Sequence, residues 1–117
     1  MLETAALRDL ALKVLDDNKA IDIKDIDVTS LTNVTDRMVV CSATSTRHAN
    51  ALADKLVRAM RDQGIRPLGI EGEEQGEWIL VDLVNIVVHI MLPSARQFYD
   101  LEKLWRTTEQ FRKEHEN

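Results

Sequence analysis

The sequence predicts one α/β domain, in which a mixed sheet of about five strands is flanked by helices. Two observations lead to this prediction. Residues 78–83 and 86–92 are short apolar runs rich in Val and Ile, which is typical of strands. Residues 7–15 and 49–60 repeat apolar side chains at three- and four-residue spacing, which is typical of amphipathic helices. Helical and strand patterns that alternate along one chain favour a sheet with helices packed on it.

The first two elements are a helix over residues 2–18 and an edge strand over residues 21–29. The strand pattern changes phase at Lys24 and Asp25, which predicts a bulge there. Asp25 and Asp27 could suggest a carboxylate metal site. Their alternation places both on one solvent-facing side, so we favour a charged edge that discourages pairing with other chains.

A central strand over residues 38–43 leads through a polar turn into a long helix that ends at Gly64. With a strand over residues 67–70 this forms a right-handed βαβ unit. A polar turn at a helix N-terminus can hold phosphate, but the turn lacks a Gly-rich loop and a Lys before Ser or Thr. We therefore interpret Ser45 or Thr44 as a helix cap. Ser45 with His48 is only a nominal catalytic pair.

Residues 78–83 and 86–92 form an antiparallel hairpin if they join through a two-residue turn at Val84 and Asn85. Trp78 then faces Met91, and the side chains sort onto two faces. The core face carries Ile79, Val81, Leu83, Ile86, Val88 and Ile90, and the other carries Trp78, Leu80, Asp82, Val87, His89 and Met91. The second face suits a partner, although a helix of the same chain could also cover it. Val resists positive φ, and a one-residue slip would exchange the faces.

The last helix is expected to begin at Ala95, after Pro93 ends the strand and Ser94 forms a capping box with Gln97. We assign residues 1–105 to the domain. Residues 106–117 are mostly charged and are expected to form a frayed helical tail.

Composition excludes several classes of protein. The net charge of −5 argues against strong, sequence-independent nucleic-acid binding. Cys41 is the single cysteine, so neither a disulfide framework nor a cysteine-based metal site is expected. There is no apolar run long enough to cross a membrane, and the N-terminal residues do not resemble a signal peptide. A cytoplasmic protein is therefore expected.

Several motifs together resemble one known family. They are Asp36, SATSTRH at residues 42–48, PLGIEG at 67–72, WILVD at 78–82, Val88-His89, and RQFYDLEKLW at 96–105. This combination, spread from about Leu7 to Trp105, resembles the ribosomal silencing factor family, also called RsfS or Iojap. The chain departs from the family pattern at Arg37, at Ala43 in place of a turn glycine, and at residues 84–85 in the hairpin turn.

The resemblance implies a nucleotidyltransferase-like topology without the catalytic carboxylates of those enzymes. It implies a translation repressor, with no catalytic, cofactor or metal site, that binds the large ribosomal subunit through universal ribosomal protein fourteen and blocks joining of the small subunit. A homodimer is expected when no ribosome is present. The implied contact residues are Trp78, Leu80, Asp82, His89, Met91, Tyr99 and Glu102. The alternative is a nucleotide-binding or nucleotidyltransferase-like enzyme that uses the Ser42–Ser45 turn.

Overall fold

The structure is a computed structural model that describes residues 3–30, 33 and 35–99. Within them, five strands form one sheet of order β1-β2-β5-β4-β3. Among neighbouring strands, the β2–β5 pair is parallel and the other three pairs are antiparallel. The elements are α1 (Thr4–Asp17), β1 (Ile21–Asp27), β2 (Arg37–Ser42), α2 (Thr46–Asp62), β3 (Gly69–Glu71), β4 (Trp78–Asp82), β5 (Ile86–Met91) and α3 (Pro93–Tyr99). The predicted mixed α/β sheet is confirmed. The end of the expected domain and the tail, residues 100–117, lie outside the described residues.

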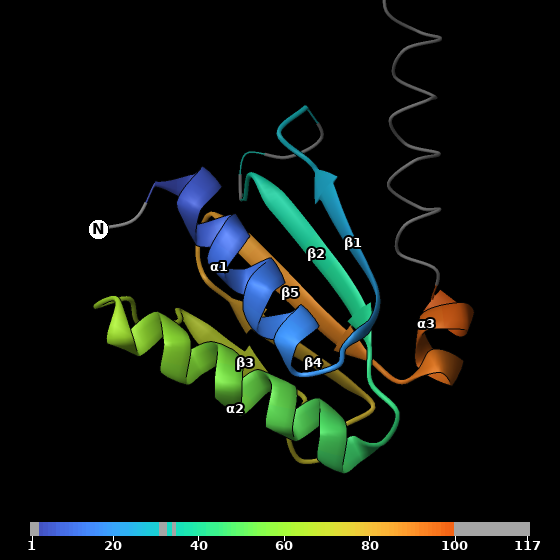
Figure 1. The fold of residues 1–117 in the computed structure, drawn as a ribbon. Helices are drawn as coiled ribbons and strands as arrows, with labels where there is room; N and C mark the ends of the chain where they lie inside the picture. Colours follow the sequence, from blue (N-terminus) through green and yellow to red (C-terminus); the bar gives the residue numbers. More distant parts are fainter. Residues whose placement is uncertain (1–2, 31–32, 34, 100–117) are drawn as a thin grey trace, which may run out of the picture.

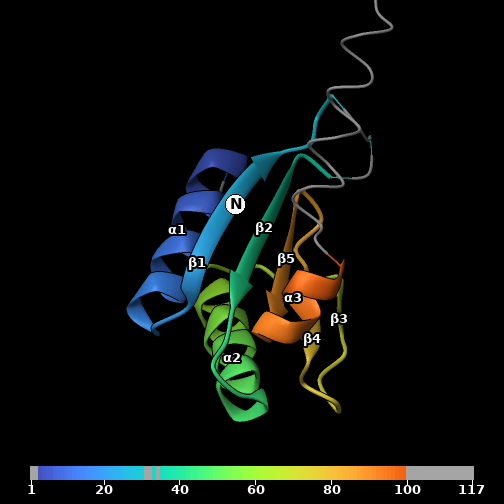
Figure 2. The same ribbon diagram turned by 90° about the vertical axis from the view of Figure 1, so that its right-hand side faces the viewer.

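Helices α1 and α2 lie on one face of the sheet, and α3 lies on the other (Figures 1 and 2). The main core forms between the sheet and the first two helices. It buries the predicted stripe of α2, which is Ala49, Leu52, Ala53, Leu56, Val57 and Met60. It also buries the predicted core face of the hairpin, from Ile79 to Ile90. None of the described helices has the length and apolarity needed to cross a membrane.

The β4–β5 hairpin has the predicted register, in which Trp78 faces Met91 and Asp82 faces Val87. Val84 has a φ of +74°, and the Asn85 amide donates to the Leu83 carbonyl, as in a γ-turn. This strained turn is held on both sides. The Val84 amide donates to Asp82 Oδ1 at 2.9 Å, and the Asn85 carbonyl accepts from the amides of residues 36 and 37. These bonds explain why the register does not slip.

The position of the irregularity in β1 and the starts of β3 and α3 differ from the sequence-based prediction. The irregularity in β1 lies between Ile21 and Lys24, where Asp22 has a φ of +50°, one or two residues before the predicted bulge. The third strand begins at Gly69 and not at Pro67. Helix α3 begins at Pro93, because proline lacks an amide hydrogen and fits the first helical position without losing a bond. The predicted capping box is therefore wrong.

Strands β2 and β3, which α2 connects, point in the same direction but are separated by β5 and β4. This arrangement makes β3 an edge strand. The expected charged side of β1 is partly covered: Asp25 forms ion pairs with Arg37 at 3.4 Å and with Arg8 of α1 at 3.7 Å. Asp27 instead accepts hydrogen bonds from Thr29. Both carboxylates therefore have structural partners.

Candidate partner-binding surface

The outer face of the sheet, opposite α1 and α2, is only partly covered by the described residues. Pairing places Glu71, Leu80 and His89 side by side on this face, with Asp82 and Val87 next to them. We define the Trp78 patch as the side chains on this face that remain half-buried or exposed: Glu71, Trp78, Leu80, Asp82 and Val87. A depression of about 270 Å³ lies within it, between Glu71, Gly72, Trp78 and Leu80. The patch combines an aromatic side chain, aliphatic side chains and carboxylates, a composition that suits a protein partner.

The Trp78 ring is held by His89 of the neighbouring strand. Its indole N–H donates to His89 Nδ1 at 2.9 Å, and the ring centroids lie 5.8 Å apart. His89 lies on the second face as expected, but it is only 8% exposed, so little of its ring is open to a partner. Burial lowers the pKa of His89 to about 4, and its Nδ1 must stay unprotonated to accept the indole hydrogen. A neutral imidazole therefore orients the tryptophan at neutral pH.

Met91 is fully buried, and the expectation that it lies uncovered beside Trp78 is wrong. It belongs to a small second core with Val28, Met38 and Val40, against which Trp78 and Ala95 pack. Ala95 belongs to α3, so a helix of the same chain covers this half of the outer face. Covering by a helix of the same chain was the alternative for the whole face, and it holds for this part of it.

Arg96 fixes α3 in this position. Its guanidinium donates to Ser42 Oγ at 2.9 Å and lies 3.4 Å from the Asp22 carboxylate, so it joins α3 to the ends of β1 and β2. Arg96 belongs to a family motif, but its structural partners are 54 and 74 positions away and local sequence patterns do not reveal them.

Gly72 shapes the floor of the depression. It has a φ of +86°, which disfavours side chains, and an added Cβ would collide with the Trp78 carbonyl group. The close approach of this turn to β4 places Glu71 beside Leu80. Glu71 was not among the contact residues expected from the sequence.

The remaining predicted contact residues differ in what the structure describes. Asp82 is half-buried, and its carboxylate accepts from the Val84 amide. Tyr99 ends α3, but its side chain lies outside what is described, and so does the whole of Glu102. The structure thus brings together Trp78, Leu80, Asp82 and His89 of the predicted set, with Met91 beneath them.

The Ser42–Ser45 turn has the capping role that we favoured from the sequence. Ser45 is the N-cap of α2, and its Oγ accepts from the His48 amide at 3.1 Å. The His48 ring accepts from the Thr44 amide and lies 3.0 Å from the Asn18 carbonyl, so it joins this turn to the end of α1. The ring is therefore bound elsewhere and not to Ser45 Oγ. Among the described residues, no group of three or more His, Cys, Asp or Glu could hold a metal ion.

Comparisons with known proteins show which family and which proteins this chain is similar to. Residues 2–117 match the family described as "Ribosomal silencing factor during starvation". A ribosomal silencing factor of Chromobacterium violaceum is 40% identical over 104 residues, which are 89% of this chain and 85% of the relative. One from Haemophilus influenzae is 41% identical over 100 residues, which are 86% and 98%. A crystal structure of a C. violaceum protein, 40% identical, has a TM-score of 0.87 over 89% of this chain and 87% of that one.

Proposed function

The chain belongs to the ribosomal silencing factor family, and from this membership we propose that it represses translation by docking the Trp78 patch on the large ribosomal subunit. The partner surface in this proposal is universal ribosomal protein fourteen. The bulk of the domain then blocks joining of the small subunit by steric overlap. No catalytic step is part of the proposal.

The observation that supports this proposal best is the arrangement around Trp78. The indole is half-buried, so part of its surface is available, and the bond to His89 fixes its orientation before a partner arrives. A rigid, partly exposed aromatic side chain loses little conformational entropy on binding, which is why such residues dominate many interfaces. Glu71 and Asp82 at the edge of the patch favour a basic partner.

We expect Trp78→Ala to weaken binding to purified large subunits by at least roughly thirtyfold, since an anchoring aromatic side chain carries about 2 kcal/mol or more. The dissociation constant is measured by sedimentation or fluorescence anisotropy at pH 7.5. Circular dichroism verifies that the variant is folded under the conditions of the assay.

Ile21→Ala is the matched control, because Ile21 is 46% exposed on β1, at the opposite edge of the sheet. Its affinity should equal that of the wild type. Wild-type affinity of a folded Trp78→Ala variant would rule out the Trp78 patch as the docking surface.

In the absence of ribosomes, we propose that two copies of the protein pair through the Trp78 patch. Multi-angle light scattering at high micromolar concentration is then expected to give the mass of a dimer for the wild type and of a monomer for Leu80→Asp, which places a charge in the patch. A monomeric wild type under these conditions would contradict self-association.

A further inference from the structure

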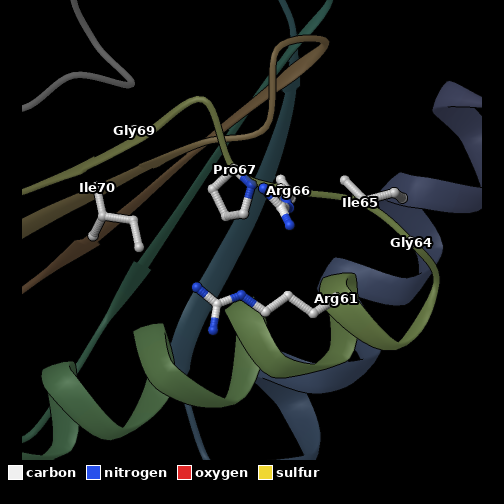
Figure 3. A pocket seen from close by; sticks show the side chains of 7 residues that line it. All are labelled: Arg61, Gly64, Ile65, Arg66, Pro67, Gly69 and Ile70. Atoms are coloured by element: carbon white, nitrogen blue, oxygen red, sulfur yellow. The ribbon is translucent and has the colours of Figure 1, made fainter.

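A groove of about 780 Å³ lies between the end of α2 and the segment that leads into β3, on the helix-bearing side of the sheet. Its apolar surface comes from Ile65, Pro67 and Ile70, and the two arginines that line it are Arg61 and Arg66 (Figure 3). Trp78 and Leu80 belong to the opposite face, so the groove is separate from the Trp78 patch.

The two guanidinium groups are available to a ligand. Both residues are exposed, and within the part of the chain that the structure describes neither forms an ion pair with a carboxylate. Of the five other described arginines, Arg8, Arg37, Arg58 and Arg96 each do, and Arg47 does not. In Figure 3 the Arg61 side chain reaches into the space between helix α2 and the segment above it, and the Arg66 side chain, seen nearly end-on, lies on that segment beside Pro67.

Arg61 also lies in the last turn of α2, where a cation stabilises the C-terminal end of a helix. That role alone would direct the guanidinium toward the last carbonyl groups. Figure 3 instead shows the side chain extending away from Gly64, below Pro67 and toward the open groove. The orientation therefore favours a ligand in the groove over a purely helix-stabilising role.

The groove is also the site of a local positive charge. Residues 54–66 contain four basic and two acidic side chains, and one of the four, Arg58, is paired with Asp54, in a chain whose net charge is −5. The rest of the molecule is correspondingly more acidic and repels a polyanion. An approaching polyanion is therefore oriented toward this segment. Arginine forks match the oxygens of phosphate groups, and the apolar surface between them suits the sugar and base of a nucleotide.

We propose that this groove binds the phosphate backbone of a ribosomal RNA segment when the protein is docked. The inference rests on the proposed function, because the ribosome supplies the RNA. Two phosphate contacts give little affinity alone, so the proposal agrees with the expectation that the isolated protein does not bind nucleic acid strongly. Within the complex they add to the contact made by the Trp78 patch and fix the orientation of the domain.

The test is the salt dependence of binding to purified large subunits at constant Mg²⁺. For a protein that contacts phosphates, log K falls with log[KCl] in proportion to the number of contacts, with about 0.7 per contact for single strands. The double variant Arg61→Gln/Arg66→Gln should therefore reduce the magnitude of the slope by about 1.4. At about 0.1 M salt its affinity should be roughly 25-fold lower than that of the wild type.

Lys13→Gln/Arg47→Gln is the control, because it removes the same charge from exposed positions on α1 and at the start of α2. It should keep a slope close to that of the wild type. If both double variants lose the same affinity and the same amount of slope, the net charge and not the groove determines binding, and the inference is overturned. It also fails if the groove variant binds as the wild type does while Trp78→Ala loses affinity. Absence of wild-type binding to large subunits would instead overturn the proposed function.

A direct titration distinguishes RNA from an acidic peptide. Oligouridylate added to ¹⁵N-labelled protein should shift the Nε resonances of Arg61 and Arg66 and the amide resonances of Gly64 and Ile65, at millimolar concentration. An oligoglutamate peptide of equal charge should shift them less, because a carboxylate chain lacks the base and sugar that contact the apolar surface. An equal or larger response to oligoglutamate would overturn the assignment to RNA.

Discussion

Lowering the pH from 7 to about 4 is expected to remove about 3 kcal/mol of stability through His89 alone. Burial holds the pKa of this imidazole at about 4 in the folded protein, whereas an unfolded histidine titrates near 6.5. Each pH unit between the two pKa values corresponds to about 1.4 kcal/mol. At pH 4 half of the folded molecules are already protonated at His89, which leaves an expected loss of about 3 kcal/mol.

The direction follows from which state binds the proton. Between pH 6.5 and pH 4 the unfolded chain takes up a proton at position 89 and the folded protein does not, so acid favours unfolding. The contribution of His89 to stability is fully present above pH 6.5 and decreases as the pH falls toward 4. Protonation of Nδ1 would also break the bond from the Trp78 indole, so the same window should disturb the Trp78 patch.

Urea denaturation of the wild type and of His89→Asn, at half-unit steps from pH 7.5 to 4, measures this effect. Asparagine keeps an acceptor near the position of Nδ1 but does not titrate, while the carboxylates contribute to both proteins. Between pH 7.5 and 4, the free energy of unfolding of the wild type should therefore fall by about 3 kcal/mol more than that of His89→Asn. Equal pH dependence of the two proteins would show that His89 is not a source of acid sensitivity.

The sequence was sufficient to predict which hairpin side chains form the core. Successive side chains of a strand point to opposite faces, and the register that sorts the side chains of residues 78–91 needed only one assumption about the turn. Val84 adopts the positive φ that we expected it to resist. The Asp82 carboxylate, which accepts from the Val84 amide, and the Asn85 carbonyl, which accepts from the amides of residues 36 and 37, offset that cost. A local side-chain bond and the bonds from a distant segment thus stabilise a conformation that the intrinsic preference of valine disfavours.

The exposure of the second face could not be predicted in the same way. Whether Met91 is covered depends on where α3 crosses the sheet, and Arg96 fixes that position by reaching Ser42 and Asp22. These contacts are between residues far apart in the chain, and no periodic pattern records them. The groove with Arg61 and Arg66 was missed for a different reason: one arginine is on a helix and the other follows it beyond Gly64, so no single periodic pattern includes both.

The burial of Met91 leads to the second large effect. We expect Met91→Ala to lower the free energy of unfolding by about 3 kcal/mol, because truncating a fully buried methionine removes packing and leaves a cavity. The loss should be seen as a lower urea midpoint with an unchanged m-value. Met91→Leu is the matched control: it conserves volume and should cost less than about 1.5 kcal/mol.

The same Met91 variants show whether Met91 only supports the Trp78 patch from beneath or also contacts the partner. If Met91 acts only beneath the patch, Met91→Leu should bind large subunits with the affinity of the wild type, whereas Trp78→Ala should not. If instead the Met91→Leu variant has nearly wild-type stability but binds large subunits roughly tenfold or more weakly, Met91 lies at the interface. Since Ala95 packs on the methionine in the free protein, that result would require α3 to move aside on docking. Together with the stability measurement, this comparison therefore tests whether the docked surface is the one that the free structure presents.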